Sequence, residues 1–263
     1  MDNVITVLIP FYNPGKYIVD AINSIYAQTY KSWKIILVDD GSTDNSPNLI
    51  KPYLFDSRIT YIRHPSNLGQ SMSLNTGLSY VETDFFVQLD PDDWFYPKTL
   101  EKLVSETLKQ PADVAVISGN INISFEDENG QVLKSYIKKG RHFSNPYDFM
   151  LANSAIWPRC YRTSIVKGIG GWLTDDPYGG RYVEDMRMLY RLIPTYRLYW
   201  IDELMLYHRR HLNNNTNALT ETAEALKWTI EDTLKKWGDN YVPVFQDKEG
   251  YRILTGFEVK QKL

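Results

Sequence analysis

The stretch Phe85-Phe86-Val87-Gln88-Leu89-Asp90-Pro91-Asp92-Asp93-Trp94 joins an apolar run to three carboxylates in four positions. The run predicts a buried strand, and the acids would then lie at its C-terminal end, where a parallel sheet opens into a cleft. Carboxylates crowded this closely repel one another, and a divalent cation with oxygen ligands is the usual way to keep them ionised. Taken alone, the acids equally fit a solvated turn before a helix that begins at Pro97.

The residues around this stretch alternate between strand and helix patterns. We expect strands at residues 4–9, 33–38, 59–62, 85–89 and 114–117, and helices at 15–28, 71–81 and 97–110, with a further helix start after residue 44. Four strand-to-helix alternations joined by short loops predict a parallel, twisted sheet with helices on both faces. Ligands bind such sheets at the carboxyl ends of the strands.

The pattern changes after residue 118. We expect a hairpin of strands 121–125 and 132–137 around Asn129-Gly130, a helix at 146–151, a strand at 156–161, a loop at 168–180, a helix at 186–193, short strands at 197–201 and 205–207, and a helix at 218–237. No repeat or linker divides the chain. We therefore predict a single α/β domain over 1–263, with a Rossmann-like nucleotide half at 1–117, a mixed half at 118–216 and a C-terminal helical extension at 217–263.

The composition excludes several classes of protein. Hydrophobic residues make up 43% and charged residues 23% of the 263 residues, as in ordinary globular proteins. A net charge of −3 argues against a nucleic-acid partner, which usually requires a basic face. The single cysteine, Cys160, excludes an intrachain disulfide, and no apolar run approaches the length of a transmembrane helix. We expect a cytoplasmic protein, at most peripheral to a membrane; its oligomeric state stays open.

Three strand ends should meet at one cleft. They are Ile9-Pro10-Phe11-Tyr12-Asn13, Val38-Asp39-Asp40-Gly41-Ser42-Thr43-Asp44 and Asp90-Pro91-Asp92-Asp93. An aromatic ring for stacking, carboxylates for a base and a ribose, and a metal for phosphates together describe a nucleoside-diphosphate site. Two alternatives remain: Tyr12 could simply pack in the core, and Asp39 and Asp40 could be turn and cap residues.

These blocks, in this order and at these spacings, resemble the family 2 glycosyltransferases of the GT-A fold, over roughly residues 3–216. The resemblance implies an enzyme of polysaccharide biosynthesis that transfers a sugar from a nucleotide-diphosphate sugar, UDP-linked, to an unidentified acceptor. The acceptor could be a saccharide, a lipid-linked molecule or a protein. Residues 1–117 would bind the donor and residues 118–216 the acceptor.

The resemblance also implies a donor site. Tyr12 would stack on uracil or another base, and Asp92 would lie nearest a Mn²⁺ or Mg²⁺ ion with Asp93 supporting it. Such a metal stabilises the negative charge of a departing nucleoside diphosphate. The expected nucleotide-binding residues are Pro10, Tyr12, Asp39, Asp40, Asn67, Asp90 and Arg209.

One position departs from the family pattern. Residues 67–77 look like the family segment Asn-x-Gly followed by Ala-Arg-Asn-x-Gly, and Leu74 stands where the family usually has arginine. That arginine commonly faces the nucleotide, so its loss leaves the donor contact at this position open. Asn75 and Gly77 match the family, and close packing of a helix on the sheet explains them at least as well as ligand contact.

The Glu184-Asp185 pair is similar to the family's Glu-Asp motif, whose aspartate is the general base. A single such base at the acceptor hydroxyl, without a carboxylate nucleophile, gives inversion at the anomeric carbon. Acids at a helix start also complement the helix dipole without any catalytic role. Trp172, in Gly170-Gly171-Trp172, resembles the family's Gly-Gly-aromatic turn and would stack on the acceptor or donor sugar.

The segment Tyr207-His208-Arg209-Arg210-His211 resembles the family's Tyr-Arg-x-His tail with one extra residue, His208. The resemblance implies that His211 ligates the metal, which favours Mn²⁺, and that Arg209 contacts the diphosphate. His208 is the rival ligand. Two other functions remain open: a sugar-nucleotide nucleotidyltransferase, although the glycine-rich, basic loop of that class is reduced here to Pro14-Gly15-Lys16, and a non-catalytic sugar-nucleotide-binding protein.

Overall fold

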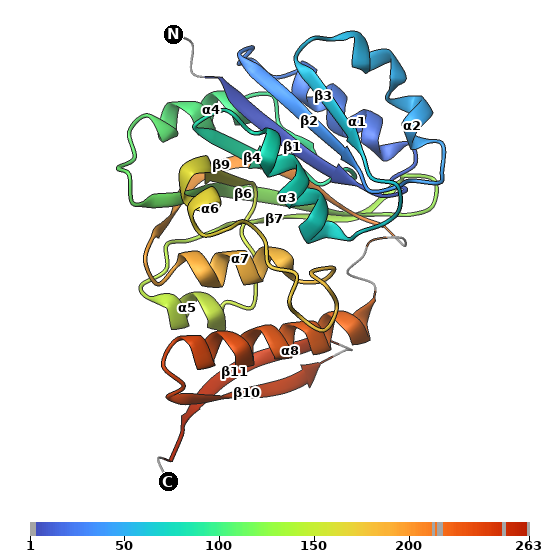
Figure 1. The fold of residues 1–263 in the computed structure, drawn as a ribbon. Coiled ribbons are helices and arrows are strands. Elements are labelled where there is room, and N and C mark those ends of the chain that lie inside the picture. The colour runs from blue at the N-terminus through green and yellow to red at the C-terminus, as the bar shows by residue number, and fades with distance from the viewer. Residues whose placement is uncertain (1–3, 212–213, 215–217, 249–250, 262–263) are drawn as a thin grey trace.

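The computed structural model of the chain describes residues 4–211, 214, 218–248 and 251–261. Within this part, one nine-stranded sheet has the order β3-β2-β1-β4-β8-β6-β9-β5, with β7 paired to β6 (Figure 1). Four strands at one side of the sheet are parallel to one another: β1 (Ile5–Phe11), β2 (Trp33–Asp39), β3 (Ile59–Arg63) and β4 (Phe85–Gln88). This part of the sheet agrees with the parallel arrangement predicted from the sequence.

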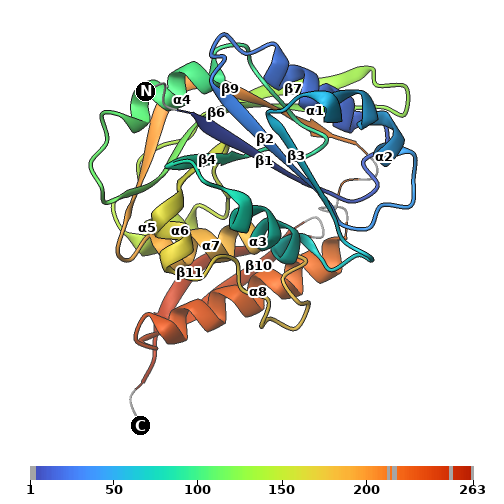
Figure 2. The ribbon, with the colours of Figure 1, turned by 45° about the horizontal axis from the view of Figure 1, so that its top comes forward.

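Helices cover both faces of the parallel strands (Figure 2). The helices of this half are α1 (Tyr17–Tyr26), α2 (Ser46–Leu49), α3 (Gln70–Tyr80) and α4 (Thr99–Thr107), with a 3-10 turn at Lys51–Phe55. Two apolar cores result. Ile9 and Leu100 belong to the core that α1 and α4 cover, and Leu8 and Leu74 belong to the core on the α3 side. The predicted α/β class, with helices on both faces of the parallel strands, is confirmed.

The second half extends the sheet with mixed strand directions. Its strands are β5 (Trp94–Phe95), β6 (Val114–Glu126), β7 (Val132–Lys138), β8 (Arg159–Arg162) and β9 (Arg197–Arg210). β8 runs antiparallel to both β4 and β6, whereas β6 and β9 are parallel. Its helices are α5 (Pro146–Leu151), α6 (Thr163–Gly168) and α7 (Glu184–Leu192).

Two strands are longer than predicted. β6 and β9 are continuous where two separate strands were expected in each, and β5 was not foreseen. The break in β6 was expected near Gly119, but a Cβ atom there would come within 2.6 Å of the Met205 sulfur. Glycine is therefore needed at this point for β9 to pack closely, and the strand continues through it with a shift in register.

The sequence predicted a purely helical C-terminal extension, but the structure also contains two strands there. Helix α8 (Leu219–Lys236) is followed by a two-stranded antiparallel sheet of β10 (Tyr241–Lys248) and β11 (Tyr251–Val259). Asn153 fixes this sheet to α5, because its side chain exchanges two hydrogen bonds of 2.7 and 2.8 Å with the backbone of Leu254. Alternating residues such as Val242 and Val244 carry the strand pattern that the helix assignment overlooked.

The α3 residues that match or depart from the family pattern have structural roles. Leu74 is fully buried beside Leu8, so this position faces the core. A Cβ atom on Gly77 would lie 2.2 Å from a methyl carbon of Leu8, so only glycine allows α3 to approach β1 this closely. Asn75 bonds both the backbone N–H and the carbonyl of Trp172, at 2.8 and 2.7 Å.

Candidate active site

The loops after β1 and β2 are bonded into one wall of the site. Asn13 adopts a left-handed backbone conformation, and its side-chain oxygen accepts hydrogen bonds from the backbone N–H groups of Thr43 and Asp44 at 2.7 and 3.2 Å. Pro10 lies inside β1, paired in register with Val38 of β2. The neighbouring Tyr12 is 46% exposed, so its ring is accessible to a stacking partner rather than packed in the core.

Asp39 is completely buried at the end of β2. Its carboxylate accepts hydrogen bonds from the Ser42 backbone N–H at 2.7 Å and from the Tyr61 hydroxyl at 2.8 Å. Burial, followed by the bond to Asp39, raises the pKa of Tyr61 to about 12. These contacts fix the turn after β2. They agree with the alternative given for Asp39 in the sequence, that of a turn residue.

Asp40 organises the loop before α3. Its carboxylate accepts hydrogen bonds of 2.8 Å from the backbone N–H groups of Leu68 and Gly69, and it lies 2.7 Å from His64 Nδ1. The side chain of Asn67, in the same loop, accepts a hydrogen bond from Arg181. The predicted nucleotide contacts Asp40 and Asn67 therefore form part of the scaffold around the cleft, with internal partners for their polar atoms.

Arg159 joins the acid cluster to the predicted base. It lies on β8, is 3% exposed, donates a 3.0 Å hydrogen bond to Asp185 Oδ2 and approaches Asp90 Oδ2 at 3.5 Å. Gln88 donates a further bond of 3.1 Å to the other oxygen of Asp90. Sequence reasoning missed Arg159. The available signal was a charged residue inside a short, otherwise apolar strand segment, between Pro158 and Cys160.

Asp185 lies in the first turn of α7, two residues after a strained backbone position. Val183 has φ +49°, a conformation that β-branched residues rarely adopt and that is characteristic of functional sites. Burial and the adjacent Asp185 raise the pKa of Glu184 to about 8. Glu184 therefore keeps its proton to a higher pH than a solvated glutamate does.

The two histidines of the tail segment contact different aspartates. His211 Nε2 lies 3.1 Å from Asp92 Oδ2, and Asn214 also donates a 2.8 Å hydrogen bond to that oxygen. His208 instead lies 2.9 Å from the buried Asp93. The structure thus brings His211, not His208, beside the predicted metal ligand; tail residues 212–213 and 215–217 lie outside the described residues.

The donor pair of Asp92 and His211 fits a divalent metal. Two ligand atoms at about 2.1 Å from an octahedral ion, at a right angle, lie about 3.0 Å apart, close to the observed 3.1 Å. Among the described residues, no three His, Cys, Asp or Glu side chains are grouped so that they could hold an ion. A divalent ion held by Asp92 and His211 would therefore take its other ligands from phosphate oxygens and water, as is usual for Mg²⁺ at substrate phosphates.

Asp93 supports this region from inside the protein. Its carboxylate accepts a 2.9 Å hydrogen bond from the backbone N–H of Arg209, and it lies beside His208. Burial raises the pKa of Asp93 to about 6, although the His208 charge opposes this shift. The aspartate therefore connects the loop after β4 to β9.

The side chains of Arg209 and Trp172 are packed against other protein groups. The Arg209 guanidinium is held between the rings of Tyr17 and Trp94, at 4.4 and 4.7 Å, and pairs with Asp20 at 2.8 Å. Tyr17 also contacts His211, at 4.6 Å between ring centres, and the diphosphate contact of Arg209 stays a prediction. Trp172 is 2% exposed, and its ring packs against other aromatic rings in the core, so it is not a platform for a sugar.

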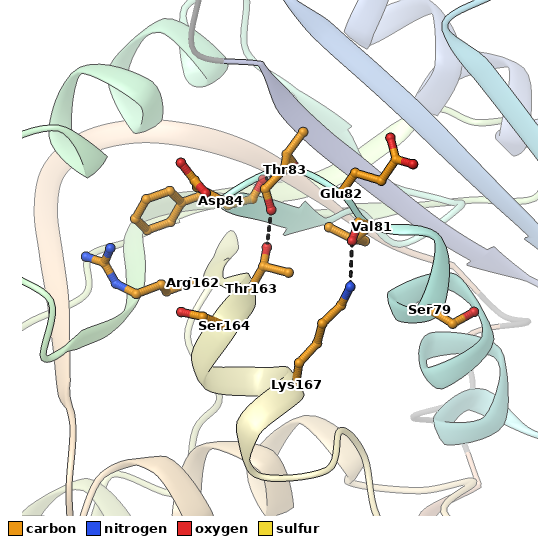
Figure 3. A pocket seen from close by; sticks show the side chains of 10 residues that line it. Ser79, Val81, Glu82, Thr83, Asp84, Arg162, Thr163, Ser164 and Lys167 are labelled. Carbon is orange, nitrogen blue, oxygen red and sulfur yellow. Dashed lines mark hydrogen bonds between the residues drawn. The ribbon is translucent and has the colours of Figure 1, made fainter.

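A separate pocket of about 410 Å³ lies at the other end of β4 from Asp90 (Figure 3). Its basic side chains already have partners. Lys167 donates a 2.7 Å hydrogen bond to the Val81 carbonyl, and Arg162 donates a 3.1 Å bond to the Val114 carbonyl. This pocket is therefore no part of the site that contains Asp90, Asp185 and Arg159.

Comparison with known proteins agrees with this geometry. Residues 6–169 match the family described as "Glycosyl transferase family 2". The chain is 34% identical over 191 residues to Glycosyltransferase GlyA of Streptococcus pneumoniae serotype 4, a match that covers 71% of the chain and 26% of GlyA. The chain therefore spans about a quarter of that relative's length.

Solved structures show the same fold. The chain superposes on residues 1–349 of S. aureus TarS in complex with UDP-GlcNAc with a TM-score of 0.64 at 19% identity, covering 88% of this chain and 66% of that one. Mannosyltransferase PcManGT from Pyrobaculum calidifontis, in complex with GDP-Man and Mn²⁺, gives a TM-score of 0.64 at 17% identity, covering 88% and 64%.

The chain belongs to glycosyl transferase family 2. This confirms both the family and the enzyme class, glycosyltransferase, that the sequence motifs predicted. Among the described residues, no helix has the length and apolar character that crossing a membrane requires.

Proposed function

We propose that the protein transfers a sugar from a nucleotide-diphosphate sugar, with UDP as the nucleotide, to an acceptor hydroxyl with inversion of configuration. One observation carries this proposal: Arg159 connects Asp90, at the donor end of β4, with Asp185, at the start of α7. A candidate base and a candidate donor-binding acid thus share one site. The TarS and PcManGT structures, solved with UDP-GlcNAc and GDP-Man, support a nucleotide-sugar donor.

Asp185 would act as the general base. It removes the proton from the acceptor hydroxyl while the acceptor oxygen forms its bond to the anomeric carbon, and the nucleoside diphosphate leaves with the electron pair of the broken bond. The other carboxyl group beside it, Glu184, has its pKa raised to about 8 and is largely uncharged at neutral pH. A protonated carboxyl group is a poor nucleophile, which favours a single displacement and hence inversion.

The donor would lie against the strand ends. Tyr12 offers an exposed ring for the base, and Asp39, Asp40 and Asn67 shape the loops around it. Asp92 and His211 would hold a divalent metal, Mn²⁺ or Mg²⁺, and a metal bound there would neutralise charge on the departing diphosphate. The Mn²⁺ in the PcManGT complex supports the use of a metal.

The domain arrangement and setting are part of the proposal. Residues 1–117 would bind the donor and residues 118–216 the acceptor, within one GT-A domain that includes the C-terminal α8 and its two-stranded sheet. A cytoplasmic role in polysaccharide biosynthesis, at most with peripheral membrane contact, is compatible with a single, buried cysteine.

Binding of UDP with Mn²⁺ tests the donor site. UDP at a hundred times its Kd should stabilise the protein by about 2.7 kcal/mol, and only in the presence of Mn²⁺ or Mg²⁺. Asp92→Ala should abolish this gain, whereas Asp84→Ala, an exposed aspartate at the opposite end of β4, should retain it. Equal stabilisation by UDP in excess chelator would refute the metal site.

Turnover tests the activity itself. A panel of UDP-sugars and GDP-sugars, incubated with Mn²⁺, should release nucleoside diphosphate from at least one donor, by transfer or slow hydrolysis. Binding of the donor without any release of diphosphate, with or without candidate acceptors, would instead support a non-catalytic binding protein.

A further inference from the structure

One face of the sheet beside Asp185 is both aromatic and basic. In the register of the strands, Ile123 of β6 pairs with Tyr136 of β7 and with His208 of β9, so these side chains share a face. Positions two residues away lie on the same face, and the ring of Trp157 stacks on His208 at 5.5 Å. We call the following residues the basic-aromatic face: Phe125, Lys134, Tyr136, Lys138, Trp157, His208 and Arg210.

Two lysines of this face, Lys134 and Lys138, lack acidic partners within the described part of the chain. Among the residues it covers, neither Lys134 nor Lys138 forms an ion pair with a carboxylate; Lys138 bonds the Ser154 hydroxyl and lies 5.4 Å from the centre of the Trp157 ring. Lys134 lies 5.7 Å from the Tyr136 ring. Burial, and then the charge of Arg210, lower the pKa of Lys138. An anion bound beside Lys138 would stabilise its charged form.

The face begins next to the catalytic group. The ring of Trp157 lies 5.6 Å from the Arg159 guanidinium, which in turn donates the 3.0 Å hydrogen bond to Asp185. Trp157, Tyr136 and Phe125 are partly or well exposed, so their rings are accessible to a ligand. A molecule on these rings would thus extend from the candidate base along β7.

The accessible side chains suit a sugar better than a lipid surface. The aromatic rings of Phe125 and Tyr136 are exposed on this face, and such rings stack well on sugar rings. The exposed aliphatic Ile137 pairs with Asn122 and therefore lies on the opposite face of β7. Ile137 is thus separated from the basic side chains with which bilayer binding would combine it.

We infer that the basic-aromatic face binds the acceptor, and that the acceptor is a saccharide bearing an anionic group, phosphate or carboxylate. This inference rests on the proposed transferase function, because the face is assigned through its distance from Asp185. Stacking on the rings would orient the sugar, and Lys134 and Lys138 would bind its charge.

The test compares three immobilised polysaccharides: phosphomannan, polygalacturonate and neutral dextran. By biolayer interferometry at low salt, the protein should bind phosphomannan or polygalacturonate at least about fivefold more tightly than dextran, and the preference should weaken as NaCl rises. The better ligand of the two identifies phosphate or carboxylate as the anionic group. Because the net charge is −3, general attraction of the whole protein to a polyanion does not account for such binding.

Single variants locate the binding. Lys138→Gln and Lys134→Gln should each weaken binding of the preferred polyanion by about fivefold, the upper end for an exposed ion pair. Lys109→Gln, an exposed lysine in the turn after α4, should change nothing. Equal binding of all three polymers, or full affinity in both Lys138→Gln and Lys134→Gln with unchanged melting temperatures, would overturn the inference.

Calorimetry of UDP with Mn²⁺, on the same preparation, separates the two proposals. If UDP binds and no polyanion is preferred, the acceptor inference fails while the donor site stands. If UDP does not bind, the proposed function fails, and with it the assignment of the face as an acceptor site, even where polyanions bind.

Discussion

The guanidinium of Arg159 donates a 3.0 Å hydrogen bond to Asp185, and its second terminal nitrogen lies 3.5 Å from Asp90. This buried cation links β8 to the ends of β4 and α7. It orients the Asp185 carboxylate relative to the donor side without needing to touch a substrate. Arg159 is therefore a candidate positioning residue rather than a catalytic one.

We expect Arg159→Met to lower both turnover and stability. Removing a buried cation leaves two partly buried carboxylates unpaired, which should reduce the free energy of unfolding by about 2 to 3 kcal/mol in urea titrations. Arg159→Lys keeps the charge without the forked geometry, so it should recover most of the stability but less of the turnover.

A double-mutant cycle separates positioning from a purely structural role. If Arg159 acts through Asp185, Arg159→Lys should reduce kcat much less in an Asp185→Asn background than in the wild type. Additive losses of kcat in the two backgrounds would show that Arg159 contributes only to folding.

The parallel half could be predicted from sequence because its signals are local. Apolar runs ended by Pro10, Asp39 and Asp90 mark strand ends, and parallel strands bring such ends to one edge. The antiparallel insertion of β8 between β4 and β6 could not be predicted, since that pairing joins residues about 75 positions apart in sequence with no local signal.

The same limit explains the errors at the site. Arg159 enters the cleft only through the β4–β8 pairing. Trp172 was read from a short motif, but Phe86 and Tyr161 enclose its ring, and neither is near it in sequence. The face of β9 on which the Arg209 side chain lies depends on the alternation of side chains along that strand. The predicted strands ended at residue 207, so they did not assign a face to Arg209.

Asp185→Asn should leave the donor site assembled and remove the general base. We expect kcat to fall by roughly 10² to 10⁴ with UDP affinity nearly unchanged, because the lost assistance belongs to the acceptor proton. Transfer at saturating donor, measured alongside UDP calorimetry, checks both parts. If the variant transfers sugar within about threefold of the wild type, the acid at 185 only complements the α7 dipole.

His211 and His208 should give different results when replaced by alanine. His211→Ala should weaken Mn²⁺-dependent UDP binding, because its ring lies beside the candidate metal ligand Asp92. His208→Ala removes the side-chain partner of the buried Asp93 and should lower the melting temperature instead. If His208→Ala alone abolished the effect of Mn²⁺, the ligand assignment would be reversed.

Leu74→Arg tests whether the family arginine can be restored. Leu74 is fully buried against Leu8 on the α3 side of the sheet, so the longer, charged side chain would be placed in an apolar core without a partner. We expect a loss of several kcal/mol of stability and insoluble or unfolded protein, by circular dichroism. Leu74→Met, similar in volume, should fold normally. A stable Leu74→Arg protein with tighter UDP binding would show that this position faces the donor.

The raised pKa of Glu184, about 8 against its usual 4.5, predicts how stability depends on pH. Between these two values the folded protein keeps a proton that the unfolded chain has lost, so the free energy of unfolding falls as pH rises, by at most about 1.4 kcal/mol per unit. Below pH 4.5 Glu184 is protonated in both states, so it causes no loss of unfolding free energy. Above pH 8 it is ionised in both states, so the loss no longer changes with pH. Glu184→Gln cannot ionise and should lose this component of the slope.

Urea unfolding at pH 5, 6, 7 and 8 measures this directly. Glu184→Gln should match the wild type near pH 5 and become progressively more stable than it towards pH 8, while Glu128→Gln, at the exposed tip of the β6–β7 hairpin, should follow the wild-type slope. A more stable Glu184→Gln variant at pH 8 would show that the Glu184 carboxyl group beside Asp185 destabilises the wild-type fold. Such a loss of stability is expected at a site shaped for activity. Parallel curves for Glu184→Gln and the wild type would show that Glu184 ionises normally, and the argument for inversion from its neutral form would then fail.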